Sequence, residues 1–185
     1  GLLEKRGKED SYIFGFEESY GYLSGEYVRD KDAVVASMLI CEMAAYYKSK
    51  GKNLLDVIKD LYAEHGMVFS SQNSFTFEGA AGMKKMQSIM DNLRALPPKK
   101  IGENSVIAIS DYETSEKLEL KSGKKTVIDL PKSNVLFYDL DDSGSNLIVR
   151  PSGTEPKIKV YITSVDPDEQ KAKSRAELWL WDMKK

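Results

Sequence analysis

The 185-residue sequence has almost no cysteine or histidine, with one residue of each. The single cysteine, Cys41, excludes a disulfide within the chain. Because Cys41 lies in the apolar run 34–41, we expect a small core residue and not a nucleophile. The single histidine, His65, excludes a histidine-based triad or a multi-histidine zinc site in this chain. His65 ends a helical pattern just before Gly66, so a structural role is expected.

Long apolar runs and an excess of charge of one sign are also missing. No stretch approaches the roughly 18–20 apolar residues of a membrane span, and residues 1–10 are too charged for a signal peptide. The formal net charge is −2, from 27 Lys and Arg against 29 Asp and Glu. Such a balance provides no positive field for a nucleic acid backbone. We therefore expect a cytoplasmic protein that binds neither nucleic acid nor a membrane.

The composition, 41% hydrophobic and 30% charged, is that of an ordinary soluble globular protein. Residues 11–16 read as a short buried strand, and residues 32–50 as a helix that is apolar on most sides and therefore buried. Residues 53–65 form a second helix with Asn53 as its cap. One strand and two helices are too few elements to bury the apolar surface that they carry. Residues 1–65 are therefore expected to be the tail of a larger α/β domain.

The rest of the sequence indicates a more self-contained unit. Strand candidates are residues 68–77, 105–112, 126–130, 134–140, 146–150 and 157–165. Residues 79–96 form an amphipathic helix whose methionines, including Met83, are expected in the core. A last helix begins at Asp166, with Pro167 at its first position. This order predicts an α+β domain with an antiparallel sheet covered by helices.

Residues 141–145, Asp-Asp-Ser-Gly-Ser, form an acidic turn cluster between two predicted strands. Their carboxylates suggest calcium, but no EF-hand spacing continues the pattern. We therefore expect a solvated turn.

A second loop, Arg-Pro-Ser-Gly-Thr-Glu-Pro-Lys at residues 150–157, has the groups that hold a phosphate monoester. Arg150 offers a planar fork to two oxygens, and Lys157 adds a point charge. Ser152 and Thr154 supply hydroxyl donors, and Gly153 lets backbone N–H groups form an anion nest. The alternative is an ordinary turn with solvated charges.

A third segment, Gly-Phe-Glu-Glu-Ser-Tyr-Gly at residues 15–21, is followed by the charged segment 28–32. Carboxylates and a serine suit hydrogen bonding to sugar hydroxyls. Their place at the end of a strand fits the position of ligands in α/β sheets. The alternative is a solvated acidic pair.

Together these motifs make the chain resemble the carboxyl-terminal portion of the α-D-phosphohexomutases, the phosphoglucomutase/phosphomannomutase family. Residues 150–156 match the family's phosphate loop, Arg-x-Ser-Gly-Thr-Glu-Pro, without gaps. Glu17, Glu18, Ser19 and Gly21 match its sugar-recognition loop, and residues 29–32 match a basic segment that follows it. The resemblance covers essentially the whole chain.

The resemblance implies that residues 1–66 are the carboxyl-terminal part of a third α/β domain and residues 67–185 a fourth, TATA-box-binding-protein-like domain. It implies phosphate binding by Arg150, Ser152, Gly153, Thr154 and Lys157, and sugar binding by Glu17 and Ser19. Arg29 and Lys31 would add positive charge. The family interconverts hexose 1- and 6-phosphates through a phosphoserine and a bisphosphate, so the implied partners are a phosphosugar and upstream domains of the same polypeptide.

Two family elements are missing from the sequence, a Thr-x-Ser-His type loop that carries the phosphoserine and an Asp-x-Asp-x-Asp-Arg loop for magnesium. The resemblance therefore implies no catalytic nucleophile and no metal ligand in this chain. It implies Mg²⁺ and glucose 1,6-bisphosphate only for the complete enzyme, and this chain alone should be inactive. Phe16 and Tyr20 depart from the Gly-Glu-Met-Ser-Gly-His form, and favour the phosphoglucomutase or phosphopentomutase-like branches.

Three alternatives remain open from the sequence. A phosphopentomutase-like member of the same family would act on another sugar phosphate. A non-catalytic phosphosugar-binding module would use the same loops without chemistry. A structural α+β scaffold would use the loop at 150–157 only as a turn.

Overall fold

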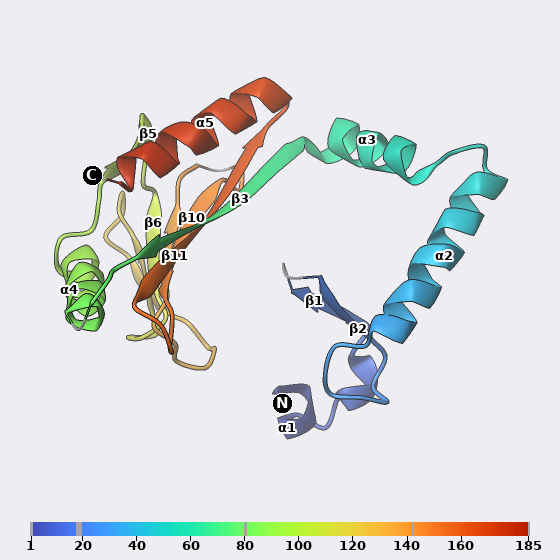
Figure 1. The fold of residues 1–185 in the computed structure, drawn as a ribbon, viewed down its shortest axis with the longest axis horizontal. Helices are drawn as coiled ribbons and strands as arrows, with labels where there is room; N and C mark the ends of the chain where they lie inside the picture. The colour runs from blue at the N-terminus through green and yellow to red at the C-terminus, as the bar shows by residue number, and fades with distance from the viewer. Residues whose placement is uncertain (1, 18–19, 80, 142, 185) are drawn as a thin grey trace. The chain divides into compact units, whose positions relative to one another are not determined.

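The computed structural model describes residues 2–17, 20–79, 81–141 and 143–184. The chain divides into two compact units, Gly1–Leu61 and Tyr62–Lys185 (Figure 1). The helix α3 (Leu54–His65) begins in the first unit and ends in the second.

The first unit is small and has few strands. Its elements are α1 (Leu2–Lys5), the 3₁₀ helix η1 (Glu9–Ser11), β1 (Phe14–Glu17), β2 (Gly21–Ser24), α2 (Ala33–Ser49) and the start of α3. β1 and β2 pair as an antiparallel hairpin. The expected strand at 11–16 therefore starts later, since Ser11 belongs to the 3₁₀ helix, and its partner β2 was not predicted.

Side-chain caps explain where both long helices of this unit begin. The Asp32 carboxylate accepts hydrogen bonds from the N–H groups of Val34 and Val35, at 2.8 and 3.2 Å. At α3 the Asn53 side chain accepts from the N–H of Asp56 at 3.0 Å, and Asp56 accepts in return from the N–H of Asn53 at 3.0 Å. This reciprocal pair is a capping box, and the predicted cap at Asn53 is confirmed.

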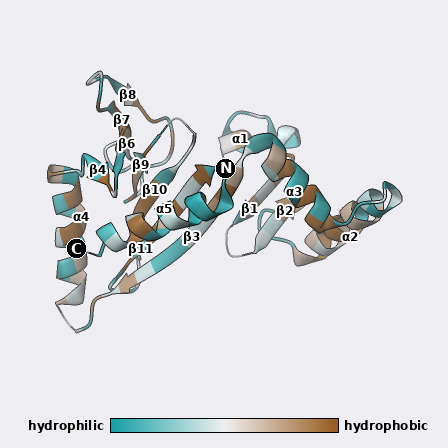
Figure 2. Cartoon of the chain, turned by 90° about the horizontal axis from the view of Figure 1, so that it is seen from above, coloured by the Kyte–Doolittle hydropathy of each residue, from teal (hydrophilic) through white to brown (hydrophobic). Residues whose placement is uncertain are grey.

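The expected burial of α2 is wrong for this unit. No residue of α2 is buried, and Cys41 is exposed and not in a core. Val34 is 80% exposed, and Met38, Ile40 and Met43 are exposed as well. The hydropathy colouring of Figure 2 shows apolar residues along this helix. The physical reason is that the hairpin β1–β2 is too small a surface to cover a helix of 17 residues.

The second unit is built on a seven-stranded antiparallel sheet in the order β3-β11-β10-β9-β6-β7-β8. The strands are β3 (Met67–Thr76), β6 (Ala108–Asp111), β7 (Glu116–Glu119), β8 (Lys125–Val127), β9 (Leu136–Asp139), β10 (Asn146–Pro151) and β11 (Lys157–Asp166). A separate ribbon pairs β4 (Lys100–Ile101) with β5 (Asn104–Ser105). The helices are α4 (Gly82–Ala95) and α5 (Glu169–Asp182). The predicted α+β class is confirmed.

The hydrophobic core lies between one face of this sheet and the helices. Residues alternate along β11, so that Ile158, Val160 and Ile162 are buried while the residues between them are partly exposed. Trp179 of α5 and Met90 of α4 are fully buried against this face. The opposite face of the sheet carries Lys157, Lys159, Tyr161 and Thr163 from β11.

Several predicted boundaries in this unit are wrong. The strand expected at 105–112 is divided between β5 and β6, and β4 and β7 were not expected. Asp166 belongs to β11, and the cap of α5 lies two residues later, where the Asp168 carboxylate accepts from the N–H of Lys171 at 3.0 Å and the helix begins at Glu169. Met83 is 46% exposed and not part of the core, because it lies in the first turn of α4.

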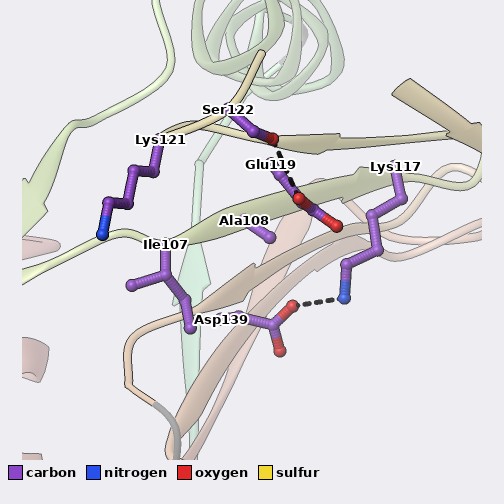
Figure 3. Close-up of a pocket in the computed structure, with 7 residues that line it drawn as sticks. All are labelled: Ile107, Ala108, Lys117, Glu119, Lys121, Ser122 and Asp139. Carbon is purple, nitrogen blue, oxygen red and sulfur yellow. Dashed lines mark hydrogen bonds and ion pairs between the residues drawn. The ribbon is translucent and has the colours of Figure 1, made fainter. Parts of the chain in front are cut away.

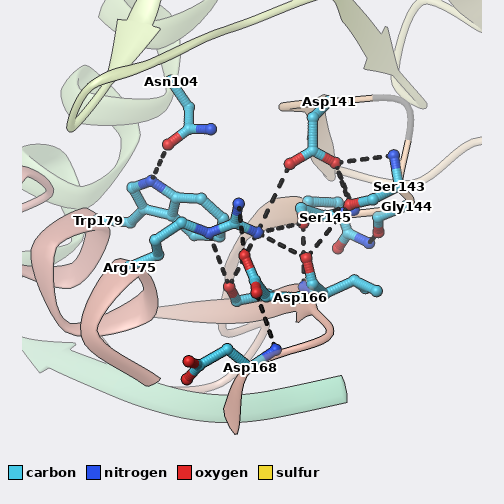
Figure 4. A network of polar contacts seen from close by, with 12 residues as sticks. Asn104, Asp141, Ser143, Gly144, Ser145, Asp166, Asp168, Arg175 and Trp179 are labelled. Atoms are coloured by element: carbon cyan, nitrogen blue, oxygen red, sulfur yellow. Dashed lines mark hydrogen bonds and ion pairs between the residues drawn. The ribbon is translucent and has the colours of Figure 1, made fainter. Parts of the chain in front are cut away.

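The turn at 141–145 is a structural junction and not merely solvated (Figure 4). The Asp141 carboxylate accepts from the N–H of Ser145 at 3.2 Å. The buried Ser145 hydroxyl accepts from the N–H of Val165 at 3.0 Å and from the Arg175 guanidinium at 3.1 Å. Arg175 also donates to the Val165 carbonyl at 2.7 Å. The turn therefore connects the start of β10 to the end of β11 and to α5.

Candidate functional site

The predicted phosphate loop connects β10 to β11. Both are interior strands of the sheet, and their register places Arg150 opposite Lys159 and Pro151 opposite Ile158. The N–H of Ser152 donates to the carbonyl of Lys157 at 2.8 Å and so closes the hairpin. The loop is therefore held at both ends by a rigid part of the fold.

Inside the loop, the Ser152 hydroxyl accepts from the N–H groups of Thr154 and Glu155 at 3.4 and 3.3 Å. These two N–H groups are used within the loop and do not form the open nest expected around Gly153. Gly153 has no positive φ, and a Cβ placed on it would meet no atom within 4 Å. The free space beside Gly153 leaves room for a ligand to approach the loop backbone.

The cations of the loop differ in their partners. Lys157 forms an ion pair with Glu155, and this hydrogen bond lowers the pKa of the Glu155 carboxyl. The Arg150 side chain is exposed and forms no ion pair or hydrogen bond with any residue that the structure describes. Lys159, which the sequence reasoning missed, faces Arg150 across the strands. Its signal in the sequence was the strand alternation, since residues 157 and 159 share one face.

The start of α4 lies against this loop. A Cβ on Gly82 would lie 2.3 Å from the carbonyl oxygen of Phe77 and 3.0 Å from the Cβ of Pro156. The N–H of Phe77 donates to the carbonyl of Pro156 at 2.8 Å. Only a residue without a side chain allows this close approach, so Gly82 fixes the distance between α4 and the loop.

In the first unit, the hairpin β1–β2 has two different faces. Phe14, Phe16 and Tyr22 pack together on one face, with ring centroids 6.2 to 6.5 Å apart. The other face carries Glu17 opposite Gly21 in the register. The two glycines of this face, Gly15 and Gly21, leave it open to the segment that follows β2.

That segment brings Arg29 and Lys31 to the same face as Glu17. The Lys31 ammonium lies 3.5 Å from a Glu17 carboxylate oxygen and 3.2 Å from one of Asp30, and the hydrogen bond that it donates to Asp30 is the main cause of its raised pKa. Arg29 pairs with Glu4 at 2.9 Å. Glu17, Arg29 and Lys31 line a pocket of about 220 Å³, together with Asp30. It is smaller than typical ligand pockets, which start at roughly 300 Å³, so this unit alone does not enclose a sugar phosphate.

Other predicted residues have different positions. Glu18 and Ser19 lie outside the described residues. Asp32, at the end of the basic segment, caps α2 and accepts a hydrogen bond from the Tyr27 hydroxyl, which is the main cause of its lowered pKa. Asp32 is therefore a structural residue of this segment.

A pocket of about 570 Å³ at the β6–β7 hairpin was not predicted (Figure 3). Lys117 pairs with Asp139 at 2.8 Å and Glu119 accepts from Ser122 at 2.9 Å, whereas the Lys121 ammonium has no ion pair or hydrogen bond among the described residues. The pocket contains none of the predicted site residues.

Within the described part of the chain, no group of three or more His, Cys, Asp or Glu side chains is arranged to hold a metal ion. In the same residues, no helix has both the length and the apolar content needed to cross a membrane.

Comparison with known proteins identifies both units. Residues 2–65 match the family model for phosphoglucomutase/phosphomannomutase, alpha/beta/alpha domain III, and residues 114–179 match that for the C-terminal domain. The chain belongs to this family. The resemblance predicted from the motifs is thus confirmed.

A phosphoglucomutase of Staphylococcus aureus (strain MRSA252) is 46% identical over 156 residues, which are 84% of this chain and 28% of that relative. A phosphoglucomutase of Staphylococcus epidermidis is 40% identical over 155 residues, with the same two coverages of 84% and 28%. The chain therefore spans about 28% of the length of these curated relatives. The open-form crystal structure of parafusin, a phosphoglucomutase from Paramecium, has a TM-score of 0.62 over 98% of this chain and 31% of that one. At 18% identity this likeness shows a shared fold.

Proposed function

We propose that this chain is the substrate-binding part of a phosphoglucomutase/phosphomannomutase that interconverts hexose 1-phosphate and hexose 6-phosphate. In this proposal residues 1–66 belong to the third domain and residues 67–185 form the fourth. The observation that carries it is the exposed Arg150, which has no protein partner among the described residues and lies opposite Lys159 at a hairpin loop. Two adjacent cations on rigid strands suit a dianionic phosphate.

The phosphate group is held by Arg150, Ser152, Gly153, Thr154 and Lys157. The Arg150 fork binds two phosphate oxygens, and Lys157 exchanges its contact with Glu155 for the stronger charge of the dianion. The Ser152 hydroxyl already accepts two N–H groups, so its proton is available to donate to a phosphate oxygen. In the complete enzyme these loop residues bind the phosphate group that is not being transferred.

The sugar hydroxyls are bound by Glu17 and Ser19, and Arg29 and Lys31 supply positive charge beside them. Support comes from the pocket that Glu17, Arg29 and Lys31 share. Because phosphoryl transfer depends chiefly on positioning and charge stabilisation, these residues contribute by holding the substrate in place.

The family resemblance also implies magnesium, which when bound neutralises charge on the transferring phosphoryl group. The described residues do not form a site for it, so no step of this proposal involves the metal. We assign its ligands, the phosphoserine and the handling of the glucose 1,6-bisphosphate intermediate to upstream domains of the same polypeptide, in the cytoplasm.

The test uses the full-length enzyme with Arg150→Ala. We expect weaker substrate binding by roughly 1.5–3 kcal/mol, the scale of one lost charged hydrogen bond. Steady-state kinetics with glucose 1-phosphate and mannose 1-phosphate measure the loss and the sugar preference. Unchanged kinetics would remove Arg150 from the site. Turnover by the 185-residue chain alone would contradict the assignment of the chemistry to other domains.

A further inference from the structure

Gly21 lies under the side chain of Lys31. A Cβ on Gly21 would be 2.4 Å from Cδ and 2.7 Å from Cγ of Lys31, and 3.5 Å from its Cβ. Cβ atoms in proteins are essentially never closer than 3.0 Å to such neighbours. The stem of Lys31 therefore occupies the space that any side chain at position 21 would fill.

This arrangement determines where the Lys31 ammonium lies. Gly21 is the cross-strand partner of Glu17, so a stem that crosses Gly21 ends beside the Glu17 carboxylate. The ammonium is 3.5 Å from Oε1 of Glu17. The N–H of Asp32 donates to the carbonyl of Tyr22 at 2.7 Å and fixes the backbone next to Lys31 against β2. Because the backbone of Lys31 is held against β2 and its ammonium lies beside Glu17, the methylene groups between them pass directly over Gly21.

The backbone itself does not require glycine at position 21. Its φ is not positive, and the left-handed residue of this turn is Tyr20, with φ 64°. Gly15, on the same face of the hairpin, faces a different group, because a Cβ there would lie 2.3 Å from the Tyr12 hydroxyl. The two glycines thus make room for different side chains, and only Gly21 makes room for Lys31.

We propose that Gly21 is a positioning residue, whose missing side chain lets Lys31 lie across the hairpin and place its ammonium beside Glu17 in the sugar pocket. The inference rests on the proposed function, which assigns Glu17 and Lys31 to the substrate site. A methyl group at position 21 displaces an exposed, flexible stem and not the backbone. The change therefore moves the charge away from Glu17 while the hairpin stays folded.

The test is a double-mutant cycle in the full-length enzyme with Gly21→Ala, Lys31→Met and the combination. We expect Lys31→Met to lower kcat/KM about tenfold, as for one lost charge-assisted contact. Gly21→Ala alone should also lower kcat/KM, as Lys31→Met does, and should leave the melting temperature unchanged. In the Lys31→Met background it should have no further effect on kcat/KM, since the ammonium whose position it changes is gone.

Gly15→Ala is the matched control, because its Cβ would meet Tyr12 and not Lys31, so its effect on kcat/KM should be the same in both backgrounds. Additive losses for Gly21→Ala and Lys31→Met would overturn the proposal, as would wild-type kinetics or loss of folding in Gly21→Ala. Wild-type kinetics for Lys31→Met would also overturn it. The Arg150→Ala test of the proposed function does not depend on any of these results. A failure of the proposed function can therefore be distinguished from a failure of the proposal for Gly21.

Discussion

Arg150 and Lys159 stand directly opposite each other on β10 and β11, on the face of the sheet that the helices leave free. Like charges in this position repel, and cross-strand pairs of this kind destabilise a sheet. Arg150 has no ion-pair or hydrogen-bonding partner among the described residues, and Lys159 forms no such contact there, although its charge helps to lower the pKa of the Glu155 carboxyl. The fold therefore keeps an unfavourable pair in the place where we propose that a dianion binds.

Replacing Lys159 by methionine should lower the activity of the enzyme and raise its stability. In the full-length enzyme we expect kcat/KM to fall about tenfold, the effect of losing one charged contact with the phosphate. Without substrate the variant should be more stable by about 0.2–1 kcal/mol, because the repulsion is relieved. Steady-state kinetics and urea unfolding measure the two effects. Lys173→Met, on the exposed side of α5, should change neither. A variant with normal kcat/KM would exclude Lys159 from the site.

Replacing Gly82 by alanine should destabilise the second unit although alanine favours a helix by about 1 kcal/mol. The new Cβ would meet the Phe77 carbonyl oxygen, a backbone atom that does not move freely. We expect a net loss of roughly 1–3 kcal/mol in the free energy of unfolding, as for other overpacked sites. Because Phe77 is hydrogen bonded to Pro156, substrate binding should weaken as well.

Urea unfolding and substrate kinetics of the Gly82→Ala enzyme measure both effects. Gly153→Ala is the stability control, since no atom lies within 4 Å of its Cβ position. A Gly82→Ala variant as stable as the wild type would show that the loop and α4 are not in close contact.

Tyr138 gives a prediction for alkaline pH. Its side chain is 0% exposed, and its hydroxyl has no hydrogen-bond partner among the described residues. Burial raises the pKa of this hydroxyl above its ordinary value near 10. The hydroxyl therefore stays neutral in the folded protein at a pH where the unfolded chain already ionises. The free energy of unfolding does not change with pH through this group below pH ~10, and it falls as the pH rises from there through the raised pKa of the folded protein.

Tyr138→Phe should stabilise the protein by about 1 kcal/mol at neutral pH, because it removes an unpaired buried hydroxyl. It should also flatten the loss of stability above pH ~10, where the unfolded tyrosine ionises. Urea unfolding between neutral and alkaline pH tests both points, with the partly exposed Tyr161→Phe as control. Equal alkaline slopes for wild type and Tyr138→Phe would contradict the prediction.

The sequence predicts the strands with clear alternation and misses those without it. β11 alternates apolar and polar residues over its length and was expected almost as observed, whereas β7, Glu-Lys-Leu-Glu, has little strand character and depends on pairing with β6. The candidate site shows the same division. The predicted phosphate loop is one contiguous segment of the sequence and can be recognised there, but the approach of Lys31 to Glu17 depends on a glycine contact that only the fold reveals.

Long-range polar partners are the least predictable part of the molecule. Residues 141–145 read as a solvated turn because Arg175, which contacts Ser145, lies 30 residues further along the chain. The position of Asp166 in β11 also depends on the full length of the β3–β11 pairing, which overrides the cap signal at that residue. Tertiary contacts of this kind outweigh local propensity.

Removing the Ser145 hydroxyl should destabilise the second unit without affecting the phosphate loop. Ser145 is fully buried, and its hydroxyl accepts from the N–H of Val165 and from Arg175. Ser145→Ala leaves that N–H without its partner, and we expect a loss of about 1–3 kcal/mol in the free energy of unfolding. Ser145 precedes β10, whereas the loop follows its other end, so the KM for substrate should stay at the wild-type value. Urea unfolding and steady-state kinetics measure the two quantities, with the exposed Ser174→Ala as control. A raised KM in Ser145→Ala would show that the network and the phosphate loop are coupled along β10.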